Sequence, residues 1–446
     1  MASPVASDSV GFRCRVTFRP GSPSWFCVRT AVASWVAASG IALVALVLGW
    51  DRLGAVALAA ALIGGWIATR SAPRPPRALV AGLLSISVAG LAIAIAARAQ
   101  QPITIGAGCA IAFAVLTREY SALVGAHILR AAAWDPRPHR AGAVVIALAL
   151  IAYLVLDESE PALVAIAAAS VLWGAFDAVA GGVAIARREL RETRPAAPRA
   201  RLDGSVRWSQ LGESSAAARD PAFWGLVIAR PLARGALQLL AEQAWLTPNR
   251  ITAASVVCCL TAAGLIAGDA GTVVTTLAIV LIGIRSVLDS MDGQLARYRA
   301  CGSQLGSYVD KVSDLFCWGA LFGALGLRAY AAEPAVSMLL LPLFAGTWLA
   351  LSGMALWLAR AMASASPAAA APLAIRTAWA RNLWRIVLFE EPDFYLWISL
   401  AVVTRRYDLF VPLIAGGHVA RGLVLVIARA GSMLTTSTFR GEANPT

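Results

Sequence analysis

Four aspartates in the second half of the chain have spacings that could bring their side chains together. Asp289 and Asp292 are three residues apart, and Asp310 and Asp314 are four residues apart. Spacings of three and four place side chains on one face of a helix. A short basic turn at 298–301 separates the two pairs, so two helices joined as a hairpin could bring both pairs to the same place. Ionisable side chains within long apolar runs are expensive to bury and mark functional sites by default.

Clustered carboxylates need compensation in a medium of low dielectric constant. Either some of them are protonated or cations neutralise them. Carboxylate oxygens are hard ligands that favour Mg²⁺ or Mn²⁺, and four negative charges match two divalent ions gripping a diphosphate. Gly293, Ala296 and Gly306 leave space for a ligand beside the carboxylates. Arg297 offers a fixed cation for phosphate. An ion or proton pathway in a membrane transporter is the alternative interpretation of the same cluster.

The aspartates belong to a longer pattern, D-x2-D-G-x2-A-R-x8-G-x3-D-x3-D, which the sequence matches at every specified position. The remaining positions of the pattern are Gly293, Ala296, Arg297 and Gly306. This pattern resembles the signature of the CDP-alcohol phosphatidyltransferases. Upstream, the segment LTPNRIT at 246–252 is similar to the opening of that family's first membrane helix. The resemblance covers about residues 221–430.

The resemblance implies a role for each matching position. Metal ligands are implied at Asp289, Asp292, Asp310 and Asp314. Asp314 is also implied as the catalytic residue that accepts the proton of the acceptor hydroxyl. Contacts to the donor substrate are implied for the small and polar positions in and around the two motifs: Asn249, Thr252, Gly293, Ala296, Arg297, Ser303 and Gly306.

The activity implied by this resemblance is transfer of a substituted phosphate group from a CDP-alcohol, such as CDP-diacylglycerol, to the hydroxyl of an acceptor alcohol. CMP is released, and the product is a phosphodiester of phospholipid or related biosynthesis. Two divalent ions, Mg²⁺ or Mn²⁺, are the expected cofactors. The expected enzyme class is that of phosphotransferases for substituted phosphate groups. The alternative is an ion- or proton-coupled membrane transporter that uses the aspartate cluster.

Two cations close to the aspartates bear on the acceptor. Lys311 is the only lysine of the chain, and Arg285 lies one helical turn before Asp289. Each could bind a phosphate on the acceptor or act as a countercharge for the carboxylates. Together with a net charge of +13, they favour a small anionic acceptor such as a phosphorylated polyol, inositol phosphate or glycerol phosphate. An amino alcohol or a second soluble sugar-alcohol remains open as the acceptor, and the CDP donor need not be a lipid.

The composition of the 446-residue chain indicates that a membrane surrounds these residues. Hydrophobic residues make up 59% and charged residues 14%, whereas a soluble domain carries roughly 25% charged residues. This excludes a disordered chain, a disulfide-linked secreted scaffold and an ordinary cytosolic enzyme. The basic residues lie in short loops between apolar runs, so we interpret them as topology signals and expect no nucleic-acid partner. The predicted fold class is an all-α polytopic membrane protein.

Apolar runs that could cross a membrane fall into two groups of six. The first group lies near residues 31–50, 53–69, 78–97, 102–117, 142–156 and 161–186. The second group lies near residues 250–268, 271–299, 303–328, 335–361, 386–404 and 408–429. Arginine-bearing loops, including 118–140, alternate with loops that are poor in basic residues. This alternation predicts about twelve transmembrane helices in two six-helix halves, with both termini in the cytoplasm.

These boundaries divide the chain into segments with different roles. We expect a cytoplasmic segment at 1–30, a six-helix membrane domain at 31–186, a polar cytoplasmic linker at 187–220, the phosphatidyltransferase-like domain at 221–430 and a cytoplasmic tail at 431–446. The domain at 221–430 is predicted to open with an amphipathic helix on the membrane surface at 221–245, followed by six transmembrane helices at 250–429. We expect a homodimer among the lipids of a bacterial inner membrane, with the active site facing the cytoplasm.

The first half has no charged stripe comparable with that of the second half. The segment around Asp177 echoes the signature weakly, which we interpret as coincidence or as one buried carboxylate with a local partner. Glu390, Glu391 and Asp393 are expected at a solvated helix start, with contact to the acceptor as the alternative. The histidines are too scattered for a metal site or a triad and fit loop or interface positions: His127, His139 and His418. We therefore expect the first half to be non-catalytic, as a dimer scaffold, a partner surface or a path for substrate or product.

Overall fold

The computed structural model describes residues 101–128, 160–192, 224–268, 271–343 and 393–418, with short pieces and single positions between them. All regular secondary structure within these residues is helical. The predicted cytoplasmic segment 1–30, most of the first three apolar runs, most of the linker and the tail at 431–446 lie outside the described residues.

Five of the described helices are long and apolar enough to cross a membrane. They are α4 (Pro102–Ile128), α6 (Glu160–Glu192), α9 (Pro248–Ala267), α10 (Gly271–Tyr298) and α11 (Gln304–Ala332). A shorter apolar helix, α14 (Asp393–Thr404), lies near the end of the described chain. The all-helical membrane class is therefore confirmed for this part of the chain, whereas the number of twelve helices and the two six-helix halves stay predictions.

Helix α4 differs from the prediction, because it runs through the residue that was expected to begin an arginine-rich loop. Arg118 is buried inside α4, and its Nε donates to Oδ2 of Asp177 on α6. The ring of Trp173 lies 5.3 Å from the guanidinium carbon of Arg118. An arginine with a buried partner does not have to end a membrane helix, so the expected loop at 118–140 began too early. Asp177 is thus the buried carboxylate with a partner that one of the two interpretations required.

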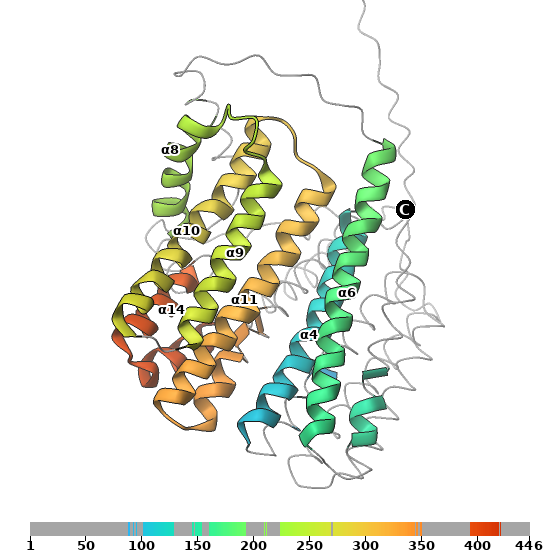
Figure 1. Ribbon diagram of the computed structural model, residues 1–446, viewed down its shortest axis with the longest axis vertical. Coiled ribbons are helices and arrows are strands. Elements are labelled where there is room, and N and C mark those ends of the chain that lie inside the picture. The colour runs from blue at the N-terminus through green and yellow to red at the C-terminus, as the bar shows by residue number, and fades with distance from the viewer. Residues whose placement is uncertain are drawn as a thin grey trace, which may run out of the picture.

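Helix α9 lies between α10 and α11 and packs along both (Figure 1). It begins where the side chain of Thr247 accepts the N–H of Arg250 at 3.3 Å, directly before a proline that fits the first helical position. The backbones of helices α10 and α11 come close at few positions, although the turn at 299–303 connects the two helices and Arg285 of α10 pairs with Asp314 of α11. The hairpin therefore stays open, and α9 serves as the common support of its two arms.

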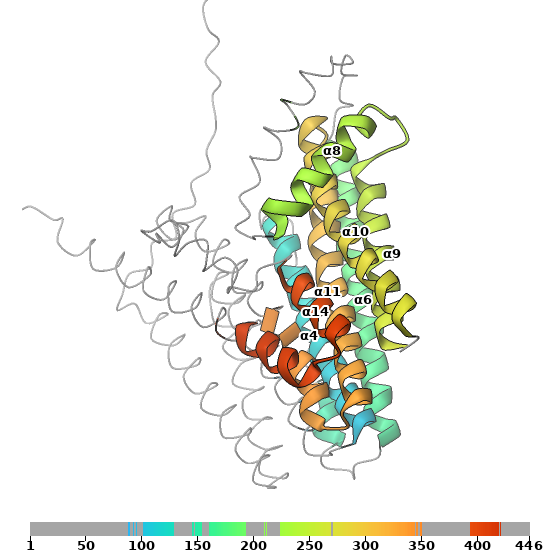
Figure 2. The ribbon, with the colours of Figure 1, turned by 90° about the vertical axis from the view of Figure 1, so that its left-hand side faces the viewer.

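A short amphipathic helix precedes this group, within the range predicted for a surface helix. A π-helical turn at Gly225–Ala229 leads into α8 (Arg230–Leu240), which crosses near the upper end of α10 in Figure 2. Ala233 and Leu237 of α8 are buried and belong to one apolar cluster with Leu295 of α10. The apolar face of α8 thus packs on the protein, and its position on a membrane surface stays a prediction.

The loop between α8 and α9 is anchored by an arginine whose role the sequence did not reveal. The guanidinium of Arg299 donates to the carbonyl oxygens of three loop residues at 2.5–3.1 Å: Ala241, Gln243 and Leu246. Beside it, the hydroxyl of Tyr298 donates to Oε1 of Glu242 at 2.5 Å. These bonds fix the end of α10 to the loop that leads into α9.

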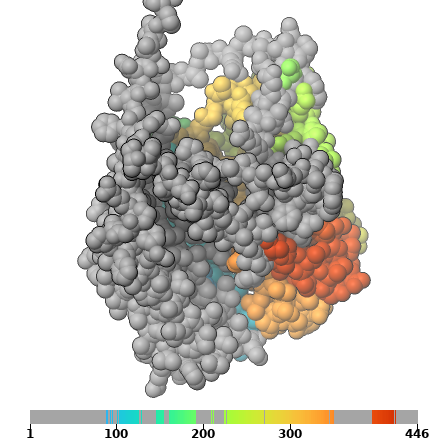
Figure 3. Space-filling model, turned by 180° about the vertical axis from the view of Figure 1, so that it is seen from behind, coloured from blue at the N-terminus to red at the C-terminus, as the bar shows by residue number. Residues whose placement is uncertain are grey.

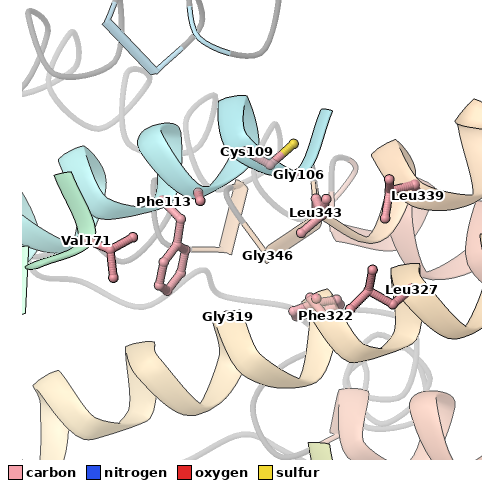
Figure 4. Close-up of a pocket in the computed structure, with 12 residues that line it drawn as sticks. Gly106, Cys109, Phe113, Val171, Gly319, Phe322, Leu327, Leu339, Leu343 and Gly346 are labelled. Carbon is pink, nitrogen blue, oxygen red and sulfur yellow. The ribbon is translucent and has the colours of Figure 1, made fainter. Parts of the chain in front are cut away.

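Helix α11 also packs against the two long described helices of the first half, α4 and α6. Phe113 of α4 points toward Gly319 of α11, beside an apolar cavity of about 280 Å³ (Figure 4). A Cβ atom at position 319 would coincide with the Phe113 ring, so this contact requires glycine. The two halves of the chain are therefore in close contact within the spanning segments.

The start of α14 is buried, contrary to the expectation of a solvated helix end. Asp393 is 4% exposed, and its Oδ1 accepts the backbone N–H of Trp224 at 2.7 Å. Seen from behind, α14 lies at the surface beside the orange residues around the end of α11 (Figure 3). His418 is also buried, with its ring edge-on to those of Phe322 and Phe394. Asp393 and His418 thus hold the fold together at positions that were expected at a solvated helix end and in a loop or interface.

Candidate active site

A cavity of about 670 Å³ lies between the ends of α9, α10 and α11 that carry the two motifs. All seven residues predicted to contact the donor line it, together with two of the aspartates: Asn249, Thr252, Asp292, Gly293, Ala296, Arg297, Ser303, Gly306 and Asp310. The cavity combines carboxylate, guanidinium, amide and hydroxyl groups with open backbone at small residues. Ligand pockets of proteins commonly have volumes of roughly 300–1,000 Å³, so this one has room for a nucleotide.

Three of the four aspartates converge beside this cavity. Asp289, Asp310 and Asp314 each place one carboxylate oxygen so that the three oxygens lie within 4.8 Å of one another. Asp292 is not part of this group; it faces the cavity, and its Oδ2 accepts the Thr252 hydroxyl at 2.5 Å. The sequence predicted a single group of four, whereas the structure forms a group of three and a separate carboxylate. Asp310 takes part in the group of three and also lines the cavity.

Two cations hold the converging carboxylates. Arg285 is 1% exposed; its Nη1 lies 2.9 Å from Oδ1 of Asp289, and its Nη2 donates to Oδ1 of Asp314 at 2.7 Å. Its guanidinium carbon lies 5.4 Å from the centre of the Tyr395 ring. This burial favours the countercharge interpretation of Arg285 over direct contact with an acceptor.

Lys311 is placed differently from Arg285. Its Nζ lies 2.9 Å from Oδ2 of Asp310 and 3.5 Å from Oδ2 of Asp314. The side chain is 38% exposed, so its ammonium group can reach an incoming ligand as well as the carboxylates. Both interpretations of Lys311 therefore fit its position.

Two glycines of the motif allow close approaches within the cavity wall. A Cβ atom at Gly306 would lie 2.9 Å from the Ser303 hydroxyl oxygen and 3.3 Å from the Asn249 amide oxygen. At Gly293, a Cβ atom would lie 3.1 Å from Nη1 of Arg297. Glycine at these two positions lets the α10–α11 turn approach α9 and lets the guanidinium of Arg297 fold over the backbone of α10.

The start of α11 is capped from two sides. The Ser303 hydroxyl accepts the N–H of Gly306 at 2.8 Å, as expected of a serine at a helix start. The carboxylate of Glu189 on α6 accepts the N–H groups of Gln304 at 3.0 Å and Leu305 at 3.2 Å. Nothing in the local sequence indicates this role, because Glu189 and its partners are more than 100 residues apart.

The converging carboxylates fit a divalent cation. Three oxygens at this mutual distance can ligate one ion, and carboxylates are the ligands that Mg²⁺ and Mn²⁺ prefer. Asp292 and Asp310 also face the cavity, where they offer oxygens for a second ion. The donor set therefore agrees with the expected cofactors.

A comparison with models of known protein families gives a match in the second half of the chain. Residues 245–405 match the family model described as CDP-alcohol phosphatidyltransferase. No curated protein matches the chain at a significant level. The matched region contains every predicted site residue and all of α9, α10 and α11. The resemblance to the CDP-alcohol phosphatidyltransferases, a family of membrane-integral transferases, is therefore confirmed for the C-terminal half of the chain.

Proposed function

We propose that the C-terminal half catalyses the metal-dependent transfer of a substituted phosphate group from a CDP-alcohol to an acceptor hydroxyl, with release of CMP. The observation that carries the proposal is the position of three converging carboxylates directly beside a polar cavity, in the region that matches the family. A cation pathway alone would explain the carboxylates. It would not explain the cavity with its glycines, hydroxyls and guanidinium.

The cavity is proposed to hold the CDP group of the donor. Asn249 and Ser303 offer an amide and a hydroxyl at its wall, and Arg297 offers a cation for the diphosphate. Gly293 and Gly306 also line the cavity, and their lack of side chains lets the Arg297 guanidinium and the Ser303 hydroxyl lie close to the helix backbone there. Thr252 contributes mainly through Asp292, because its hydroxyl donates to that carboxylate.

The carboxylates would hold the divalent ions beside the diphosphate. Asp289, Asp310 and Asp314 form one position, and Asp292 with Asp310 offers the other. Bound there, divalent ions supply positive charge against the oxygens of the diphosphate. Arg285 orients the carboxylates of Asp289 and Asp314 from the buried side, so these groups are fixed before substrate arrives.

Asp314 is proposed to take the proton of the acceptor hydroxyl. Its carboxylate is 3% exposed, and Arg285 fixes one oxygen while Lys311 lies near the other. The acceptor oxygen forms a bond to the β-phosphorus, the bond from this phosphorus to the bridging oxygen breaks, and CMP leaves with that oxygen. Lys311 lies where it can hold an anionic group of a phosphorylated acceptor.

Purified full-length protein with Mg²⁺ or Mn²⁺ and a panel of CDP-alcohols and acceptors tests the proposal. CMP release should require both substrates and the metal, and Asp289→Ala, Asp292→Ala and Asp310→Ala should each lower it by about 1,000-fold or more. Asp408→Asn is the matched control, because this aspartate is exposed and pairs only with Arg406 among the contacts resolved here. Retained turnover in the three variants would contradict the metal-site assignment. Metal-independent uptake into vesicles without CMP would support the transporter alternative.

A further inference from the structure

The first turn of α11 obtains its hydrogen-bond partners from both halves of the chain. The first N–H groups of a helix have no partner within the helix itself. Here Gly306 and Ser307 donate to the side chain and the backbone carbonyl of Ser303, whereas Gln304 and Leu305 donate to the carboxylate of Glu189. Half of this turn is therefore held by α6.

A second contact ties α6 to α11 one turn further along. The hydroxyl of Tyr308 donates to the carbonyl oxygen of Ala178 at 3.0 Å. The Tyr308 ring lies against Gly182, where a Cβ atom would approach it to 3.6 Å. Ala178 directly follows Asp177, whose ion pair with Arg118 joins α6 to α4. The two described helices of the first half thus support α11 as a unit.

This support acts on the wall of the cavity. Ser303, which caps α11, lines the cavity together with Gly306 and Asp310 from the first two turns of the helix. The backbone of helix α10, which carries the opposite wall, comes close to that of α11 at few positions, and the ion pair of Arg285 with Asp314 joins the two helices beyond the capped turn. The position of the α11 wall therefore depends on α9 on one side and on α6 on the other.

We propose that Glu189 is a positioning residue for the donor substrate, through which the N-terminal half fixes the α11 wall of the nucleotide cavity. This inference rests on the function proposed above. A carboxylate suits the position because negative charge is favourable at a helix N-terminus and because its two oxygens serve two N–H groups. A glutamine has one acceptor oxygen and no charge, so it cannot replace both bonds.

Steady-state kinetics of full-length Glu189→Gln and Glu189→Ala tests the proposal. We expect kcat/KM for the CDP-alcohol to fall by about 10- to 100-fold, chiefly through KM for the donor, since small misplacements at a site have effects of this size. KM for the acceptor should stay within about twofold, because Asp314 and Lys311 lie deeper along α11 than the capped turn. Leu190→Ala is the control, as this neighbouring side chain is 84% exposed, and Glu189→Asp should restore part of the loss.

Hydrogen exchange measured by mass spectrometry separates this proposal from the proposed activity. In Glu189→Ala, a peptide covering 301–308 should exchange several-fold faster than in the wild type and in Leu190→Ala, whether or not any donor is turned over. Unchanged exchange would overturn the contact itself. Faster exchange with an unchanged KM for the donor would show a purely structural cap and overturn the positioning role. Absence of CMP release from the wild type would count against the activity alone.

Discussion

The spanning helices contain two buried ionic groups of opposite design. Between α4 and α6, one carboxylate, Asp177, meets one guanidinium, Arg118, and both are nearly inaccessible to solvent. Between α10 and α11, three carboxylates converge within 4.8 Å beside a cavity. In the first group one carboxylate faces one guanidinium, and both side chains are buried. The second gathers like charges at an opening.

The difference shows how an ionic group for structure can be distinguished from one for chemistry. In a pair of opposite charges, the attraction between the two side chains offsets the free energy that is needed to remove them from water. Converging carboxylates repel one another, and the arrangement is favourable only when cations from outside join it. Arg285 and Lys311 reduce this repulsion, yet they pair with three carboxylates between them. The surplus negative charge indicates the place where a ligand cation belongs.

Removal of one carboxylate from each group should have opposite consequences for stability. Asp177→Asn removes the negative charge that faces the buried Arg118, and the free energy of unfolding should fall by roughly 3–5 kcal/mol. Asp289→Asn removes a partly exposed member of a repelling group, and stability should change by less than about 1 kcal/mol. Thermal melts in detergent measure both. Equal losses in the two variants would contradict the distinction between the groups.

The contact between α4 and α11 can be broken without touching either ionic group. Gly319→Ala places a methyl group where the Phe113 ring lies, so stability should fall by about 1–3 kcal/mol. Gly323→Ala is the matched control, because it lines the same cavity and nothing lies within 4 Å of a Cβ atom there. The double change Phe113→Leu with Gly319→Ala should recover part of the loss. Loss of stability in Gly323→Ala to the same extent would contradict this interpretation of the cavity.

The smallest effect is expected from removal of the Thr252 hydroxyl, a neutral group that donates a hydrogen bond to Asp292. Thr252→Val keeps the shape of the side chain but removes the hydroxyl that donates to Asp292. Since such supporting bonds typically contribute about 10-fold or more to metal affinity, the Mg²⁺ concentration for half-maximal CMP release should rise by about that factor. Thr261→Val, on an exposed position of the same helix, should leave the metal dependence unchanged.

The spacing of the aspartates was sufficient to predict where they gather, because helical periodicity fixes which side chains share a face. It could not separate Asp292 from the other three, since the group that draws it aside is Thr252, 40 residues earlier on α9. The two sequence motifs were sufficient to predict the seven cavity-lining residues, because both motifs lie at helix ends that meet in the fold. Their close approach at Gly306 depends on Asn249, which only the folded chain brings there.

The wrong expectations share one physical cause. Hydropathy treats each charge as if it faced water, so it predicts the start of a loop at Arg118 and a solvated position for Asp393. In both cases a distant partner compensates the burial: Asp177 for Arg118, and the Trp224 amide, 169 residues away, for Asp393. Whether a charged side chain can be buried depends on its partner, and only the fold determines which residue becomes that partner.

The contact from α6 to the first turn of α11 also has a consequence for the order in which the chain is made. Glu189 precedes its partner Gln304 by 115 residues, so α6 leaves the ribosome well before α11 exists. Protein chains generally fold from the N-terminal part onward during synthesis. Helix α11 therefore emerges toward a partner that is already in the membrane. We therefore expect the N-terminal half to be available as a support for α11 during synthesis, before any substrate is bound.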